Sequence, residues 1–404
     1  MNTSILKFKP HSGLNTSKKL SGINLTTLPP LSLYVHFPWC VKKCPYCDFN
    51  SHENKKSFNE NAYIEALRKD LESTLPLIWG RPIHSIFIGG GTPSLLSAAG
   101  LDQILADIRA RIPMAPDIEI TLEANPSSVE SGKFESYAAS GVNRISIGVQ
   151  SFQTSKLESL GRIHNADEAK LAVLTAQKYF KLINIDLMYG LPQQTLSEAI
   201  DDLQQALAFN TGHISLYQLT LEPNTLFSSN PPTLPDEDLI DDMQEALLSL
   251  LQKNGYDRYE ISAFAKKKHS CWHNQNYWSF GDYVGIGAGA HGKISFPEKI
   301  MRTVKEKHPE TYIRKMTDDG QAIIEEKIVA SKELPFEFML NALRLIHGVP
   351  APEFENRTGI TLLQISKQLS LAQEKGLLIN DINQLQATPL GLRFLNNLQE
   401  LFLP

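Results

Sequence analysis

The stretch YVHFPWCVKKCPYC, residues 34–47, places Cys40, Cys44 and Cys47 directly after an apolar run rich in β-branched residues. Thiolates are the usual protein ligands of iron–sulfur clusters, and a cubane has four irons to ligate. A Cys-x3-Cys-x2-Cys loop can set three sulfurs around one face of a cubane, which leaves one iron for a small molecule that carries an amine and a carboxylate. The spacing therefore predicts a [4Fe–4S] cluster on these three cysteines.

A structural zinc site is the alternative that the same spacing allows. Zinc normally takes four protein ligands, and His36 or His52 could supply the fourth. The chain has four cysteines in all, whereas a secreted disulfide scaffold would spread more of them along the sequence. Three thiols within eight residues favour metal binding in a reducing compartment, and we expect a cytoplasmic protein.

The bulk composition is that of an ordinary globular protein. The 404 residues suggest two domains, with 42% hydrophobic and 21% charged residues. A net charge of −5 gives no support for nucleic-acid binding. We expect no transmembrane segment, because no stretch approaches the roughly 20 apolar residues that span a bilayer. The N-terminus also lacks the apolar core of a secretory signal.

Residues 1–29 carry four lysines, no acidic residue and many Asn, Ser and Thr, and they end at Pro29-Pro30. Low hydrophobicity without periodicity predicts a disordered N-terminal extension. A transit peptide is the alternative, since it shares the acidic-poor, Ser-rich bias, but this stretch has no arginine.

Beyond the double proline, residues 30–270 alternate short apolar runs with helical spacing, which predicts βαβ units and a parallel sheet. Six units fit a partial (β/α)6 barrel, and an open doubly wound sheet is the alternative that periodicity cannot exclude. The expected strands are residues 31–37, 84–88, 118–123, 144–149, 183–188 and 213–219, and the expected helices are 63–75, 101–112, 166–180, 196–209 and 236–254.

The rest of the chain divides into two further parts. We expect residues 271–309 to be a linking segment, with the motif HNQNYW and the glycine-dense run GDYVGIGAGAHG, which suggests close backbone packing or a tight loop. Residues 310–404 predict a smaller, mostly helical C-terminal domain, resembling a winged helix, with helices at 336–346, 362–375 and 389–401.

A glycine run follows the second expected strand, and polar residues lie at or near the later strands, at whose ends the active sites of barrels collect. Gly89-Gly90-Gly91-Thr92-Pro93 lets the backbone approach a ligand closely, although a plain turn explains it equally well alone. Singly, each polar residue is no more than an ordinary loop anchor; together they make candidate ligand contacts. They are Glu123, Gln150, Arg162 and Asp186.

From about residue 31 to its end, the sequence resembles the radical S-adenosylmethionine (SAM) superfamily. Within it, the chain resembles the oxygen-independent coproporphyrinogen III oxidase-like family, and specifically its heme chaperone branch, HemW. The stretches that carry this resemblance are HFPWCVKKCPYCDFNSH, IFIGGGTPSLL, TLEANP, GVNRISIGVQSF, LGRIH, DLMYGLP, YQLTLEPNT, HNQNYW and PFEFMLNALRLI. The resemblance implies a C-terminal domain of the HemN/HemW type and SAM contacts from Tyr34, Tyr46, Gly91, Thr92, Pro93, Glu123, Gln150, Arg162 and Asp186.

One departure separates the branches of that family. The oxidases carry a further cysteine two residues beyond the third, and here that position is Phe49. The resemblance therefore implies a heme chaperone that delivers heme to acceptor hemoproteins, including respiratory, membrane-bound ones. An oxygen-independent coproporphyrinogen III oxidase of porphyrin biosynthesis is the enzyme alternative, and a zinc-stabilised binding module is the third. The sequence leaves open whether SAM is cleaved and whether the protein is a monomer or a dimer.

The motif HNQNYW supplies candidates for heme itself: His273, Tyr277 and Trp278. A neutral imidazole is a common ligand of heme iron, and aromatic rings can flank a porphyrin. The alternative is a partly buried structural corner. Cys271 is a further soft ligand, unless it is a buried inert thiol.

Overall fold

The computed structural model describes residues 23–54 and 58–404, and a 12-stranded sheet forms its centre. Six parallel strands lie side by side in the order of the chain. A doubly wound sheet would reverse its strand order at a switch point, and no reversal occurs among these six strands. The expected six strand–helix units are therefore confirmed, with the barrel-like order. The strands are β1 (Leu31–Phe37), β4 (Ile83–Gly90), β5 (Met114–Ala124), β6 (Arg144–Gln150), β7 (Leu182–Tyr189) and β8 (His213–Gln218).

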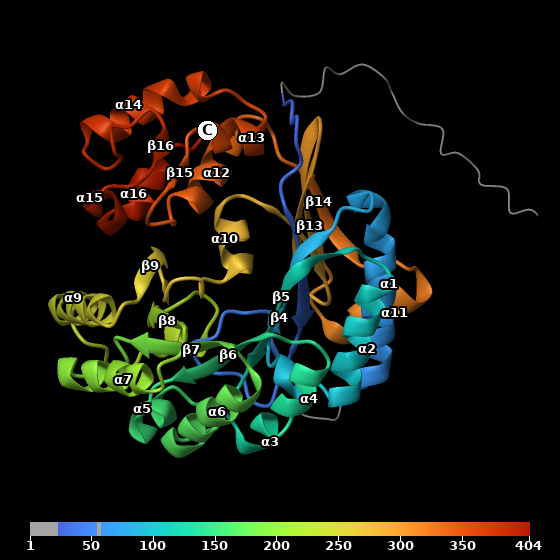
Figure 1. Cartoon of the computed structure of the whole chain (residues 1–404), viewed down its shortest axis with the longest axis vertical. Coiled ribbons are helices and arrows are strands. Elements are labelled where there is room, and N and C mark those ends of the chain that lie inside the picture. Colours follow the sequence, from blue (N-terminus) through green and yellow to red (C-terminus); the bar gives the residue numbers. More distant parts are fainter. Residues whose placement is uncertain (1–22, 55–57) are drawn as a thin grey trace, which may run out of the picture.

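Helices follow these strands and cover the outside of the sheet (Figure 1). Several begin at side chains that accept a backbone N–H, and Asn165 and Thr195 each form a full capping box with a glutamate three residues on. Local sequence thus sets where these helices start. The helices are α1 (Glu60–Ile78), α2 (Ala98–Arg109), α3 (Ser128–Ser131), α4 (Phe134–Ala139), α5 (Thr154–Ser159), α6 (Ala166–Tyr179), α7 (Leu196–Ala208), α8 (Leu226–Ser229) and α9 (Glu237–Lys253), with a 3-10 turn at Pro93–Leu95.

The segment expected to link two domains is instead part of the sheet. β11 (Asp282–Ile286) pairs parallel to β1, and β12 (His291–Phe296), β13 (Lys299–Lys305) and β14 (Ile323–Ile328) extend that edge antiparallel. β9 (Asp257–Glu260) and β10 (Ala263–Ala265) close the opposite edge beside β8, and α10 (Trp272–Trp278) leads back across.

The barrel unit also extends past residue 310. α11 (Pro309–Asp318) packs on α1, and its Tyr312 and Met316 belong to the core of the barrel unit. The glycines of the run at 281–292 carry no side chains whose alternation would mark a strand, which is why the sequence suggested a loop there.

The C-terminal domain has a separate core around Phe338, Phe354 and Leu398. It is mostly helical, as expected, and the expected helix at 389–401 is broken at Phe394. Its elements are α12 (Leu334–Ala342), β15 (Val349–Pro350), α13 (Pro352–Thr358), a 3-10 turn at Leu362–Ile365, α14 (Ser366–Glu374), β16 (Gln384–Leu385), α15 (Pro389–Arg393) and α16 (Leu395–Glu400), with β15 and β16 paired antiparallel.

The N-terminal segment differs from the expected disordered extension where it is described. Ile23 and Leu25 are buried in the core of the C-terminal domain, and the Asn24 N–H donates to the Gly359 carbonyl at 3.2 Å. Residues 1–22 of that expected extension lie outside the described residues. Within the described ranges, no helix combines the length and the apolarity needed to cross a membrane.

Candidate functional site

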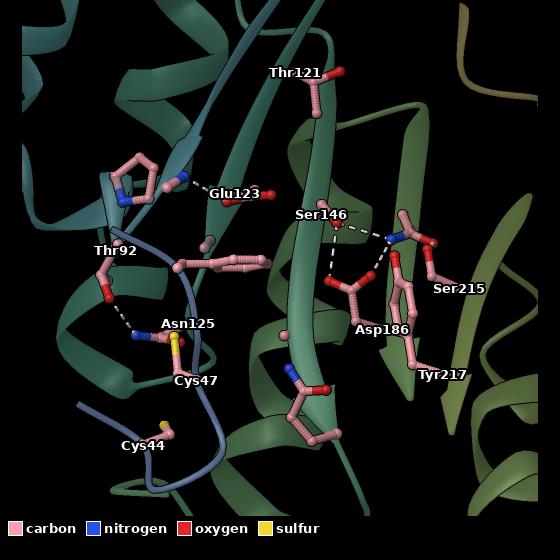
Figure 2. A pocket seen from close by; sticks show the side chains of 18 of the residues that line it. Cys44, Cys47, Thr92, Thr121, Glu123, Asn125, Ser146, Asp186, Ser215 and Tyr217 are labelled. Carbon is pink, nitrogen blue, oxygen red and sulfur yellow. Dashed lines mark hydrogen bonds between the residues drawn. The ribbon is translucent and has the colours of Figure 1, made fainter. Parts of the chain in front are cut away.

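The inward-facing side chains of the parallel strands enclose a cavity of about 330 Å³. Branched apolar residues usually fill the interior of such barrels. Here, alternate positions of β5 to β8 carry shorter or polar groups, so the interior stays open. The inward-facing set comprises Thr121, Glu123, Arg144, Ser146, Asn184, Asp186, His213, Ser215 and Tyr217. Figure 2 shows many of these side chains, with Cys44 and Cys47 at one end of the cavity.

The cysteine loop runs from β2 (Trp39–Cys40) to β3 (His52–Glu53), which pair with each other. Cys40, Cys44 and Cys47 all line the cavity, and the Cys47 N–H donates to the Cys44 carbonyl at 3.1 Å. All three thiols are free of disulfides. The structure thus brings the three predicted cluster ligands to the rim of one cavity.

Neither histidine of the zinc alternative lines this cavity with the cysteines. Both ring nitrogens of His36 are engaged, Nδ1 with the Tyr34 hydroxyl at 3.0 Å and Nε2 with the Asn50 carbonyl at 2.9 Å. His52 Nε2 reaches the Lys307 carbonyl at 3.2 Å. Among the described residues, no three His, Cys, Asp or Glu side chains are placed to hold a single metal ion. Three thiols without a fourth ligand fit a cubane better than a zinc ion.

The glycine loop after β4 lies directly against the cysteine loop. The Gly91 N–H donates to the Phe37 carbonyl at 2.6 Å, and the Thr92 N–H donates to the Trp39 carbonyl at 2.7 Å. A Cβ on Gly91 would lie 2.5 Å from the Trp39 carbonyl oxygen. Only glycine fits there, so the close approach needs the residue that the sequence has.

Arg162 ties the cysteine loop to the strands behind it. Its Nη1 donates to Cys44 Sγ at 3.6 Å, and its Nη2 donates to Asn125 Oδ1 at 2.7 Å. Asn125 in turn donates to Thr92 Oγ1 at 3.1 Å, which links the glycine loop to the same network (Figure 2). A fixed guanidinium beside a thiol suits a site that carries negative sulfur ligands.

Two carboxyl groups, those of Glu123 and Asp186, line this cavity. Burial, and secondly the charge of Asp186, raises the pKa of Glu123 to about 8, although the Gly90 N–H donates to it at 3.1 Å. Burial also raises the pKa of Asp186, against hydrogen bonds from Ser146 and Asn184. Glu123 therefore carries a proton near neutral pH and can donate as well as accept a hydrogen bond.

The remaining candidates for SAM contacts divide between two places. Tyr46, Pro93 and Gln150 line the same cavity, and Gln150 adopts a φ of 68° where β6 loses register with β7. Tyr34 does not line it. It lies in an adjoining cavity, next to the first one along β1.

This second cavity, of about 360 Å³, is lined by two residues of the motif at 273–278. His273 and Tyr277 line it together with Tyr34, Tyr283 and His291. The two cavities share Phe49, Gly90 and Glu123. Phe49 is 60% exposed, so the position at which the oxidases have a cysteine lies at the common mouth of both cavities.

His273 is held as a neutral imidazole. Its Nδ1 is hydrogen bonded to Ser85 Oγ at 3.0 Å, and its ring packs on Phe87 with centroids 4.9 Å apart. Burial lowers the pKa of His273 to about 4. Its Nε2 makes no hydrogen bond to any residue that the structure describes. His273 thus lines the second cavity with an imidazole whose Nε2 is unpaired among the described residues.

Trp278 and Cys271 do not line the second cavity, and Cys271 lines the first one. Trp278 packs against the core of the C-terminal domain, with the Arg344 guanidinium 4.3 Å from its ring centre. The Cys271 thiol donates to Glu119 at 3.2 Å, and burial raises its pKa. The inert-thiol interpretation of Cys271 fits this geometry, and Tyr283 lines the second cavity where Trp278 does not.

Several functional-site residues escaped the sequence-based prediction. Asn125 connects the glycine loop with Arg162, and it stands two residues after Glu123 in the motif TLEANP. The inward positions of β6 and β7 could have been found by counting every second residue back from Gln150 and Asp186. Tyr283 and His291 could not, because the glycine-rich run hid their strands.

The chain matches two protein-family models, described as the radical SAM superfamily over residues 34–206 and the HemN C-terminal domain over residues 329–394. The heme chaperone HemW of Haemophilus influenzae is 50% identical over 382 residues, which cover 93% of this chain and 98% of that protein. The heme chaperone HemW of Escherichia coli is 49% identical over 381 residues, which cover 94% and 100%.

Among solved structures, the coproporphyrinogen III oxidase HemN from Escherichia coli, a radical SAM enzyme, has a TM-score of 0.80 at 23% identity, covering 93% of this chain and 90% of that one. At that identity the likeness shows the shared fold, which is the α/β radical SAM fold with its C-terminal domain. Identity near one half over almost the whole of both chains goes further: the protein belongs to the HemW family of the radical SAM superfamily.

Proposed function

We propose that this protein is a heme chaperone that binds heme in the second cavity and carries a [4Fe–4S] cluster and SAM in the first. The observation that carries the proposal is the adjoining pair of cavities. One is rimmed by three thiols, and the other contains a neutral imidazole with a free nitrogen. Relatives that are about half identical are named heme chaperones, which supports the same conclusion.

The first cavity fits a cubane with one open iron. Cys40, Cys44 and Cys47 would hold the cluster, and the glycine loop would lie along the methionyl part of SAM, where its backbone leaves no room for a side chain. When bound, the cluster would supply an electron to SAM. Arg162 holds the cysteine loop in place, while the protonated Glu123 can donate to a ribose or carboxylate oxygen.

The second cavity suits a heme that must later leave. His273 Nε2 would ligate the iron, and the rings of Tyr277, Tyr283 and Tyr34 would contact the porphyrin. Ser85 fixes the tautomer and the orientation of the imidazole through Nδ1. The shared mouth at Phe49 would give the porphyrin a route out of the cavity. Acceptor hemoproteins, including respiratory ones in membranes, would receive the heme from the cytoplasmic side.

The test of this proposal is the variant His273→Ala. We expect about one heme per wild-type chain, and a changed Soret band and weaker heme binding in the variant, measured by heme difference spectroscopy. The matched control is His347→Ala, because His347 is an exposed histidine whose Nε2 contacts only Asp257 at 3.0 Å.

Thermal melting separates a ligand from a structural corner. If His273→Ala melts like wild type and binds heme with an unchanged spectrum and affinity, the ligand assignment is wrong. If the variant melts early and also loses the cluster, His273 is a structural residue. Failure of the wild-type protein to bind heme would overturn the chaperone function itself.

A further inference from the structure

The inner end of the first cavity contains two buried polar groups that the cluster and SAM do not explain. Thr121 on β5 and Arg144 on β6 are register partners in adjacent parallel strands, so their side chains point to the same side of the sheet. Both line the cavity, and they are only 1% and 2% exposed. Figure 2 shows Thr121 at the end of the cavity away from Cys44 and Cys47.

Each of these two residues has one atom without a partner. Arg144 Nη1 and Thr121 Oγ1 are buried, yet neither makes a hydrogen bond within the part of the chain that the structure describes. Buried polar atoms are nearly always hydrogen bonded, because leaving one unpaired in a protein interior is costly. Two such atoms at neighbouring positions of one cavity indicate a ligand.

The rest of Arg144 is rigidly held. Its Nε donates to Glu119 Oε2 at 2.9 Å, and its Nη2 donates to the carbonyls of His269 and Ser270 at 2.9 and 3.0 Å. These bonds fix the guanidinium, so Nη1 stays without a partner while Arg144 lines the cavity. This is the geometry of a preorganised binding group.

Glu119 forms a buried ion pair with Arg144, and it uses only one of the three guanidinium nitrogens. Besides Arg144, its carboxylate accepts hydrogen bonds from the Cys271 thiol and from the backbone N–H groups of Trp272 and His273, at 3.1–3.2 Å. The Glu119 carboxylate thus accepts hydrogen bonds from four donors, two of them backbone N–H groups at the start of α10. Since Glu123 is protonated near neutral pH, it adds no negative charge to the cavity.

We propose that the inner end of this cavity binds the carboxylate of a ligand, with one oxygen accepting from Arg144 Nη1 and the other from Thr121 Oγ1. Two neighbouring donors, one of them charged, match the two oxygens of a carboxylate. The carboxylate belongs either to a small free acid or to the side chain of a larger ligand, such as a heme propionate. The site goes beyond the proposed function: a free acid would bind here without it, whereas a heme propionate rests on it.

The first arm of the test uses sodium propionate and propionamide at equal ionic strength, which differ only in the charged oxygen. Propionate should raise the melting temperature of the wild-type protein more than propionamide does, because a ligand of the folded state stabilises it. Thr121→Val, which has the same shape without the hydroxyl, should lose that preference, and Thr121→Ser should keep it.

The second arm compares heme with heme dimethyl ester. If the carboxylate is a propionate of heme, wild type should prefer heme by about tenfold or more, the effect of one charge-assisted hydrogen bond, and Thr121→Val should reduce the preference. Arg144→Lys is the second variant and should act in the same direction. Each preference compares two ligands on the same variant. A change in that variant's basal stability therefore does not alter the interpretation.

A preference for propionate over propionamide that depends on Thr121 supports a free acid as the ligand. A preference for heme over its dimethyl ester that depends on Thr121 supports a heme propionate. Equal behaviour of acid and amide, together with equal behaviour of heme and its ester, means that the two groups bind only water, and it overturns the site. Absence of any heme binding to wild type counts against the proposed function alone, because the first arm still decides this inference.

Discussion

Gly91→Ala should separate the glycine loop from the cysteine loop. The new methyl group would lie 2.5 Å from the Trp39 carbonyl oxygen, 2.8 Å from its carbon and 3.0 Å from the Phe37 carbonyl oxygen. All three atoms belong to the backbone, so no side chain can rotate away. The loop must move instead, and it loses the hydrogen bonds from the Gly91 and Thr92 N–H groups to those two carbonyls.

Two backbone hydrogen bonds at about 1 kcal/mol each make the expected loss of folding free energy about 2 kcal/mol. The same movement shifts Thr92 away from Asn125 and the cavity. We therefore expect a lower urea midpoint and a SAM affinity at least tenfold weaker, since about 1.4 kcal/mol corresponds to a factor of ten. Equilibrium dialysis of the reconstituted protein with labelled SAM measures the affinity.

Gly80→Ala is the matched control for this prediction. Gly80 has a φ of +68°, but a Cβ there would meet no atom within 4 Å. The variant should lose about 1 kcal/mol from backbone strain and should leave SAM binding unchanged. A Gly91→Ala protein with a wild-type urea midpoint and wild-type SAM affinity would show that the contact between the two loops does not shape the site.

Three further outcomes follow from the site. Alanine variants of Cys40, Cys44 and Cys47 should each lose the broad visible absorption of the reconstituted cluster and Cys271→Ala should keep it, so loss in the Cys271 variant alone would contradict the ligand assignment. Burial raises the pKa of Glu123 from 4.5 to about 8, so the folded state is progressively destabilised as the pH rises from about 4.5 to about 8, and the loss levels off above that value. The side chain of Glu123→Gln stays neutral, so the melting temperature of this variant should rise relative to that of wild type between pH 5 and pH 9. A difference in melting temperature that does not change with pH would refute the raised pKa of Glu123. Because Phe49 replaces the further cysteine of the oxidases, reduced protein with SAM should not convert coproporphyrinogen III to protoporphyrinogen IX. Chromatography of the oxidised porphyrins measures this, and turnover above a cluster-free control would move the protein to the enzyme class.

The sequence by itself determined the features that depend on neighbours along the chain. The three thiols within eight residues, the six alternating strands and helices, and the helix starts at Asn165 and Thr195 are local patterns. The spacing of polar residues at strand ends also placed Glu123, Gln150 and Asp186 at one cavity, because parallel strands present their carboxyl ends at the same edge.

Tertiary structure alone decided what lies across that cavity. β11 pairs with β1 although about 250 residues separate them, and glycines leave no alternation that would announce such a strand. Tyr277 and Trp278 are adjacent in sequence, but neighbours on a helix point about 100° apart, so one faces the second cavity and the other faces the C-terminal core. The unpaired atoms of Thr121 and Arg144 appear only once two strands and the start of α10 meet around one interior, because a side chain's partners are set by the packing of distant segments and not by its own position in the chain.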